Sequence, residues 1–137
     1  MPAFQPTGDQ FRAFRDDPHD GPIAQVNLLK FRAQAEYPED AAEHGDGASG
    51  KEAYLRYVDA FERMAAEAGG KCVFKAGAER FFIGTGDWDM VWINRFPDRK
   101  AFIATLNHEG YKEASRHREA GLAHQDLVVT RPEDLGL

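Results

Sequence analysis

The chain has 137 residues, of which 42% are hydrophobic and 29% are charged, so it suits one domain, residues 1–137, with a core of its own. Its 23 acidic and 17 basic residues give a formal net charge of −6 at pH 7, which argues against nucleic acid as a partner because such a surface repels phosphate backbones. The single cysteine, Cys72, excludes a disulfide within the chain. The apolar runs are too short to span a bilayer or to serve as a signal peptide, so we expect a cytoplasmic protein without a membrane partner.

An N-terminal extension, residues 1–20, precedes the predicted core, residues 21–131. Phe11 and Phe14 are spaced i, i+3 within the extension and predict a short helix. The core opens with a predicted strand at residues 21–32, because small apolar side chains alternate there with a second set. One face of this strand is therefore small and apolar, and the other is mixed, with Ile23, Gln25, Asn27, Leu29 and Phe31.

A loop, residues 33–50, follows the first strand. It is rich in glycine, alanine and acidic residues and has no sustained period, so we expect it to be mobile. Ser49 and Glu52 have the spacing of a capping box and predict the start of a long helix. Apolar residues recur at i, i+3 and i+4 along that helix, Tyr57 among them, until Gly69 ends it.

A predicted strand closes this first strand–helix–strand unit, and a second unit of the same order follows it. One strand is predicted over residues 71–84, with a bend at Gly77, and another over residues 90–96, after the turn GTGDWD. The remaining predicted elements are helices over residues 97–107 and 110–122 and a final strand over residues 124–132.

The order βαββαβ predicts an α+β fold of the ferredoxin-like kind, with a four-stranded antiparallel or mixed sheet and helices on one face. The strands at residues 23–31 and 90–96 would be the central pair, expected here as parallel neighbours. We expect the helices to pack on the small apolar face of the sheet, which leaves large apolar side chains on the opposite face. A second copy, packed sheet against sheet in a homodimer, would then cover Leu29, Phe31, Met90, Trp92 and Phe96.

Three stretches of the chain, PIAQVNLLKFR, GDWDMVWINRFPDRKAF and HEGYKEASRHREAGL, resemble the bacterial family called domain of unknown function 1330. The resemblance covers residues 22–130 and implies a dimeric α+β barrel, in which two ferredoxin-like subunits join their sheets. The wider superfamily contains cofactor-free monooxygenases, haem-degrading enzymes and isomerases, whereas the family itself has no established chemistry. The resemblance therefore bears on the fold rather than on a reaction.

Arg118 interrupts the apolar stripe of the last predicted helix. It shares a helical face with Tyr111 and Leu122, so its guanidinium should point towards the sheet and must meet an anion there or reach solvent. One interpretation places a substrate carboxylate or enolate beside Arg118. The other pairs it with an internal carboxylate, for which the candidates are Asp89, Glu79 and Asp126.

Two amides, Asn27 and Asn94, interrupt the strand faces that also carry large apolar residues. A buried amide needs hydrogen-bonding partners, so these two either line a substrate pocket together with Trp92 or bond across a dimer interface. Tyr57 is either a core residue or a further part of that pocket.

His117 is the candidate general base, because an imidazole titrates near neutral pH, although a surface position would fit it as well. The sequence has no His and Cys spacing that is typical of a metal site, and FFIGTGDWD lacks the glycine pattern of a nucleotide-binding turn. We therefore expect neither a metal nor a cofactor.

Three functions fit these residues. The first is a cofactor-independent enzyme that transfers a proton to or from, or oxygenates, an acidic organic substrate in a cavity between helices and sheet. The second is a small-molecule-binding dimer without turnover, and the third is a purely structural dimer. The first two use Arg118 to hold an anion, whereas the third pairs Arg118 with a protein carboxylate.

Overall fold

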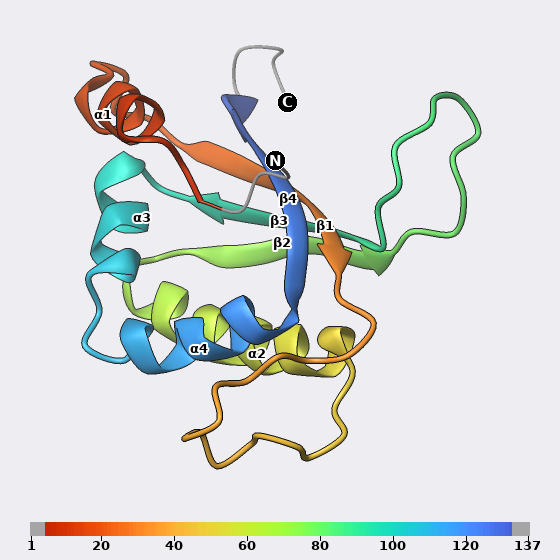
Figure 1. The fold of residues 1–137 in the computed structure, drawn as a ribbon. Helices are drawn as coiled ribbons and strands as arrows, with labels where there is room; N and C mark the ends of the chain where they lie inside the picture. The colour runs from red at the N-terminus through yellow and green to blue at the C-terminus, as the bar shows by residue number, and fades with distance from the viewer. Residues whose placement is uncertain (1–4, 133–137) are drawn as a thin grey trace.

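One four-stranded sheet, in the order β2-β3-β1-β4, organises the molecule, and every pair of neighbouring strands is antiparallel (Figure 1). The fold is seen in a computed structural model that describes residues 5–132; residues 1–4 of the N-terminal extension and residues 133–137 lie outside it. The elements are α1 (Gly8–Asp16), β1 (Ile23–Phe31), α2 (Gly50–Glu67), β2 (Lys71–Gly77), β3 (Met90–Phe96), α3 (Arg99–Leu106), α4 (Tyr111–Gly121) and β4 (Leu122–Thr130).

The predicted α+β, ferredoxin-like architecture is confirmed, but the two central strands are antiparallel rather than parallel. The helix α2 carries the chain from β1 back to β2, which makes these two strands parallel, and β3 lies between them. Because β3 pairs antiparallel with β2, it must also run antiparallel to β1. This register places Asn27 opposite Trp92 and Gln25 opposite Asn94.

The helices begin where the sequence predicts them. Thr7 and Ser49 each form a capping box, at α1 and α2, and the Asp98 carboxylate accepts a hydrogen bond from the Ala101 backbone amide at the start of α3. In the part of the chain that the structure describes, none of the helices is long and apolar enough to cross a membrane.

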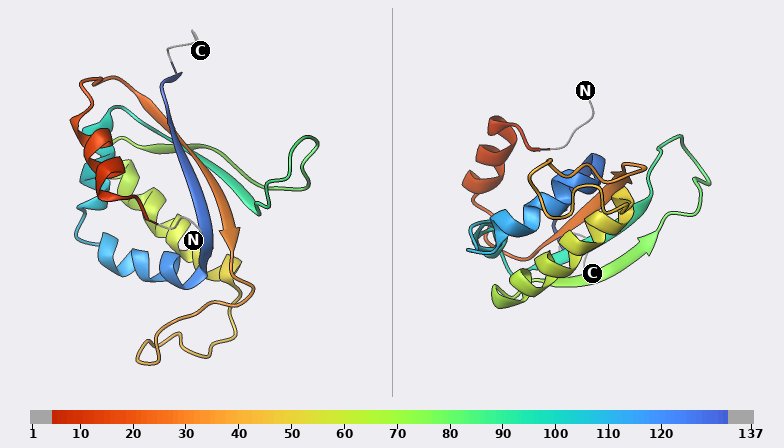
Figure 2. Two further views of the ribbon diagram at one scale, coloured as in Figure 1. Left: turned by 45° about the horizontal axis from the view of Figure 1, so that its top comes forward. Right: turned by 60° about the horizontal axis from the view of Figure 1, so that its bottom comes forward.

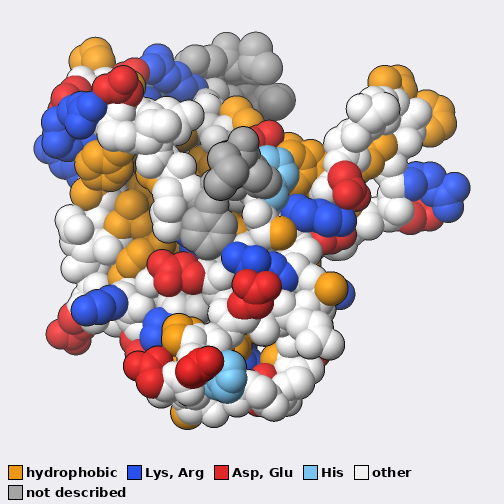
Figure 3. Space-filling view, in the orientation of Figure 1, with side chains coloured by type: hydrophobic (Ala, Val, Ile, Leu, Met, Phe, Trp, Pro, Cys, Tyr) orange, Lys and Arg blue, Asp and Glu red, His pale blue; other side chains and the backbone are white. Residues whose placement is uncertain are grey.

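The strand β2 ends at Gly77 instead of bending there and continuing to residue 84. Residues 78–89 form a long connection to β3 that projects from the body of the molecule, with hydrophobic side chains at its tip (Figures 1 and 3). Phe82 and Ile83 are 95% and 85% exposed. These apolar side chains, which led us to predict a strand, therefore do not contribute to the core.

The helices pack on the face opposite to the one that we expected (Figure 2). The large side chains Trp92 and Phe96 lie between the sheet and α2, against Tyr57 and Phe61, so they are not free to meet a second copy. The physical reason is volume, because large side chains fill the space between a sheet and helices that small ones would leave empty. The same holds for the other three residues of the predicted interface, Leu29, Phe31 and Met90.

The outer face of the sheet is the small one, and none of the described helices covers it. This face consists of the residues that alternate with the core positions of β1 and β3, together with the residues of β2 and β4 that are paired with them. We call this surface the outer face and define it by Val26, Leu28, Phe74, Val91, Ile93 and Val128.

Two glycines allow close backbone contacts at the start of α2. A Cβ at Gly121 would overlap the carbonyl oxygen of Gly50, and a Cβ at Gly50 would overlap the carbonyl oxygen of Arg32. Gly121 therefore lets α4 approach the start of α2, and Gly50 lets the start of α2 approach the backbone of Arg32, just after β1.

The loop at residues 33–50 hangs beneath α2 and α4 and has one aromatic anchor (Figure 1). Tyr37 is buried against Ala53 and Ala120, and the backbone amide of Glu36 donates to the carbonyl of Ala120 at 2.9 Å. The loop therefore packs on its own subunit, and its mobility stays a prediction.

Candidate functional site

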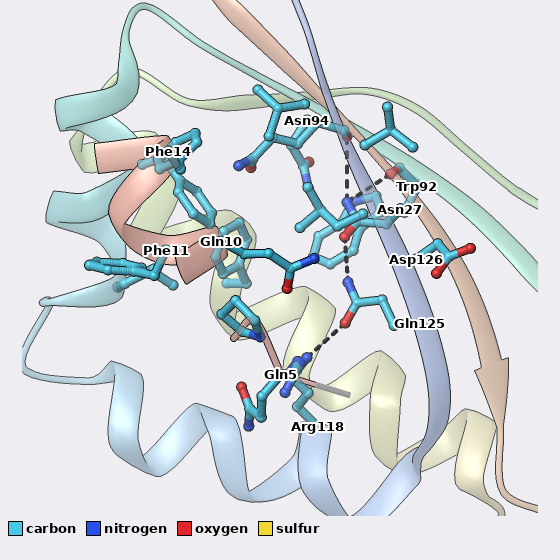
Figure 4. A pocket seen from close by; sticks show the side chains of 18 of the residues that line it. Gln5, Gln10, Phe11, Phe14, Asn27, Trp92, Asn94, Arg118, Gln125 and Asp126 are labelled. Carbon is cyan, nitrogen blue, oxygen red and sulfur yellow. Dashed lines mark hydrogen bonds between the residues drawn. The ribbon is translucent and has the colours of Figure 1, made fainter. Parts of the chain in front are cut away.

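A cavity of about 710 Å³ lies between the helices and the sheet, where the sequence predicted one (Figure 4). The strands β1, β3 and β4 form its floor, α2 and α4 form its walls, and α1 with the preceding residues covers it. Its aromatic lining consists of Phe11, Phe14, Tyr54, Tyr57, Phe61, Trp92, Phe102 and Tyr111. Its polar lining includes Gln5, Gln10, Gln25, Asn27, Asn94, Arg118 and Gln125.

A chain of hydrogen bonds links Arg118 on α4 to the floor of the cavity (Figure 4). Arg118 Nη2 donates to Gln125 Oε1 at 2.7 Å, and Gln125 Nε2 donates to Asn27 Oδ1 at 2.7 Å. Asn27 Nδ2 in turn donates to the Trp92 carbonyl at 3.0 Å. These bonds fix the orientation of both amides, and they hold a guanidinium that is only 9% exposed at the cavity wall.

Two further amides on the floor have different surroundings. Gln25 and Asn94 face each other across β1 and β3, each is 3% exposed, and both line the cavity. Within residues 5–132, neither side-chain amide has a hydrogen-bonding partner.

Trp92 is held in place from outside the cavity. Its indole Nε1 donates to Glu62 Oε2 at 3.1 Å, and Glu62 also pairs with Lys75 at 2.9 Å. The indole meets the rings of Tyr57 and Phe61 edge to face, with centroids 6.2 and 5.5 Å apart. The ring is therefore a rigid apolar surface of the cavity.

Tyr54 and Tyr57 add hydroxyl groups to the aromatic wall. Burial raises the pKa of Tyr54 and the pKa of Tyr57 well above the ordinary value of a tyrosine. The hydroxyl of Tyr57 lies 3.3 Å from that of Tyr111. Both buried phenols stay protonated at neutral pH, so they can donate hydrogen bonds but are poor bases.

The structure brings together five of the six predicted site residues and leaves out His117. Arg118, Asn27, Asn94, Trp92 and Tyr57 line the cavity. His117 instead contacts the loop at residues 33–50, where its Nδ1 lies 2.7 Å from the hydroxyl of Tyr37. Burial lowers the pKa of His117, and the charge of neighbouring Arg116 lowers it further.

The predicted carboxylate partners of Arg118 are occupied elsewhere or point elsewhere. Asp89 accepts from the backbone amide of Phe31 at 2.9 Å, and Glu79 pairs with Arg80 on the projecting connection. Asp126 is exposed at the edge of the cavity, and its carboxylate points away from Arg118 (Figure 4).

Sequence reasoning missed Gln25, Gln125 and the contribution of α1. Gln25 had a signal, because it lies two residues before Asn27 on the same face of a strand. The position of α1 depends on Arg99, whose guanidinium lies 4.9 Å from the Phe14 ring and whose Nε donates to the His19 carbonyl at 3.1 Å. Such contacts between distant segments leave no local pattern in the sequence.

Among the described residues, His, Cys, Asp and Glu side chains form no cluster of three or more that could hold a metal ion. The polar groups that line the cavity are amides, hydroxyls, one guanidinium and, at its edge, the carboxylate of Asp126, a set suited to an organic ligand rather than to a metal.

Comparison with known proteins connects the chain to a family. Residues 48–131 match the family model described as a domain of unknown function, DUF1330. A crystal structure of RPA0582, a protein of unknown function from Rhodopseudomonas palustris, is similar at a TM-score of 0.85 and 31% identity, over 96% of this chain and 98% of that one. The methylated form of RPA0582 gives a TM-score of 0.87 at 30% identity, over 99% and 98%.

The search of curated proteins found no match. The family model matches more than half of this chain, and the similarity to RPA0582 extends over nearly all of both chains. The chain therefore belongs to the family of the domain of unknown function 1330.

Proposed function

We propose that this protein binds a small acidic organic molecule in the cavity between its helices and its sheet. The observation that carries the proposal is the joint lining of one 710 Å³ cavity by aromatic walls and by the buried guanidinium of Arg118. This volume is in the range of small-molecule sites, which are mostly apolar with a few placed polar groups. A guanidinium keeps its charge and suits a carboxylate, which it can bind through two parallel hydrogen bonds.

Binding without turnover is the form of the proposal that the geometry favours. Proton transfer would need a base beside the ligand, and the buried phenols of Tyr54 and Tyr57 have raised pKa values. His117 lies outside the cavity lining, and the Asp126 carboxylate points away from Arg118, where the acidic group of the ligand would bind. The cavity thus offers positioning and charge rather than acid–base groups, and the proposal needs neither a metal nor a prosthetic group.

The proposed assembly is a homodimer formed through the outer face of the sheet. Phe74 and Val128 on the edge strands are 52% and 50% exposed, and Ile93 lies between them on β3. A second copy is the simplest cover for an apolar sheet face, because the two surfaces are identical and match in size and character.

Replacing Arg118 tests the binding proposal. Calorimetric titration with biphenyl-4-carboxylic acid should show binding to the wild-type protein and an affinity about ten- to a hundredfold lower for Arg118→Met, because a hydrogen bond to a charged group is lost. Arg116→Met is the matched control, since Arg116 lies on the same helix but pairs with Glu43 and Glu113 away from the cavity.

The opposite result would identify a structural role for Arg118. If the guanidinium serves an internal ion pair, Arg118→Met should lower the free energy of unfolding by about 3–5 kcal/mol and leave the affinity for the acid unchanged. That outcome would reject the binding proposal.

A further inference from the structure

We infer that Gln25 and Asn94 form a second polar subsite, which receives a hydroxyl or carbonyl group at the end of the ligand away from its carboxylate. This inference rests on the proposed function, because it assumes that Arg118 holds the acidic end. It assigns the ligand to a narrower class, elongated aromatic acids that carry a neutral polar group at their far end.

Gln25 and Asn94 have unmet hydrogen-bonding capacity. Each residue is 3% exposed and lines the cavity, and its side-chain amide has no hydrogen-bonding partner within residues 5–132. Neither amide is among the fully enclosed side-chain atoms that lack a partner in the described part of the chain, so the small exposed surface of each residue includes its amide, which faces the cavity. Since the great majority of buried polar groups are bonded, two such amides at a cavity wall point to a ligand group that bonds them. Asn27 lies two residues after Gln25 on the same strand face and differs from this pair. Both its amide nitrogen and its amide oxygen are hydrogen-bonded within the protein, as expected of an amide with a structural role.

Two adjacent amides favour a neutral polar group over a carboxylate. Each carboxamide offers two donor hydrogens and an acceptor oxygen, so the pair can donate to and accept from one group at the same time. A hydroxyl group both donates and accepts, and a carbonyl accepts from two donors. A carboxylate can only accept and is better served by Arg118, so the two subsites favour different groups on one ligand.

The spacing along β1 sets the length of the ligand. Strands rise about 3.3 Å per residue, so Gln25 lies about 7 Å from Asn27 and about 13 Å from Leu29. Leu29 is paired with Gln125, which receives the hydrogen bond from Arg118. The two polar ends of the ligand should therefore lie about 7–13 Å apart. The rings of Trp92 and Tyr57 line the space around them, which suits an aromatic body.

Two matched acids test the inference: biphenyl-4-carboxylic acid and 4′-hydroxybiphenyl-4-carboxylic acid, which differ only in the hydroxyl group at the far end. Calorimetric titration should show that the wild-type protein binds the hydroxylated acid about three- to tenfold more tightly, the range of one or two neutral hydrogen bonds. Asn94→Leu, which keeps the size of the side chain and removes its amide, should erase that preference. Its affinity for the plain acid should stay at the wild-type value or rise.

Two further variants complete the cycle. Asn107→Leu makes the same exchange at the exposed end of α3, outside the cavity lining, and should keep the wild-type preference. Gln25→Leu should reduce the preference as Asn94→Leu does, and it provides the measurement if Asn94→Leu does not fold by circular dichroism.

The outcomes distinguish failure of the subsite from failure of the proposed function. Equal affinities of the wild-type protein for the two acids, or a preference that survives both Asn94→Leu and Gln25→Leu, would overturn the subsite and leave the proposed function standing. Binding of neither acid would overturn both. Loss of the preference in both variants, with binding of the plain acid retained, would establish the subsite.

Discussion

His117 and Arg118 are adjacent in the chain and have different environments, because successive residues of a helix point about 100° apart. Arg118 reaches the cavity, whereas His117 meets Tyr37, whose hydroxyl also accepts a hydrogen bond from Arg56 Nη1 at 2.9 Å. The histidine therefore links α4 to the loop at residues 33–50. Its contacts are those of a residue that holds the loop in place.

The lowered pKa of His117 gives this role a pH signature. Protonation is harder in the folded state than in the unfolded chain, so the stability contributed by neutral His117 is present above its ordinary pKa of 6.5 and is lost as the pH falls below it. His117→Asn cannot titrate, so its free energy of unfolding should fall less than that of the wild type between about pH 7.5 and pH 5.5. Urea denaturation at each pH measures the difference.

The same variant should leave the affinity for biphenyl-4-carboxylic acid unchanged, because His117 lies outside the cavity lining. Identical pH dependence of the wild type and His117→Asn would show that neither the burial of the imidazole nor the charges of Arg116 and Glu43 shift its titration.

At the scale of elements, the crossing of α2 and α4 depends on Gly121. Helix propensity alone predicts that Gly121→Ala would stabilise the protein, since alanine is the better helix former by about 1 kcal/mol. The added Cβ would instead overlap Gly50 and force the helices apart, so we expect a net destabilisation of about 1–3 kcal/mol.

Urea unfolding of Gly121→Ala measures this effect, with Gly77→Ala as the control. A Cβ at Gly77 would meet nothing closer than the Asp89 carbonyl at 3.9 Å, so this exchange should change the stability little. A more stable Gly121→Ala protein would mean that the helices can separate at no cost.

The elements other than the end of β2 were predictable, and so were five of the residues that line the cavity. Alternation in β1 and β3 marks which side chains share a face. It could not show which face the helices cover. That depends on whether Trp92 and Phe96 find enough volume beneath α2, and this is a property of packing between distant segments. Gln125 was harder to identify, since β4 carries no regular alternation of polar and apolar residues to mark its inward positions.

For the molecule as a whole, the exposed apolar residues of the outer face predict a homodimer. Light scattering at micromolar concentration should give about twice the chain mass of 15.3 kDa. Ile93→Asp should give a monomer, because it places a charge at the centre of the outer face, where burial against a second copy would remove its hydration.

Leu55→Asp is the matched control for Ile93→Asp. Leu55 is 39% exposed on α2, on the other side of the sheet, so its replacement should leave the dimer intact. A wild-type protein that is monomeric under these conditions would contradict the assembly through the outer face.

The two tryptophans of the chain lie on opposite sides of the sheet. Trp92 forms part of the cavity floor, whereas Trp88 stacks on His124 at 4.7 Å, and His124 is paired with Lys30, on the side of the outer face. Intrinsic fluorescence can therefore follow two events separately. Emission from Trp92 should change when a molecule enters the cavity, and emission from Trp88 should change when a partner approaches the outer face. In a Trp88→Phe protein, Trp92 is the one remaining tryptophan, so all tryptophan emission comes from the cavity.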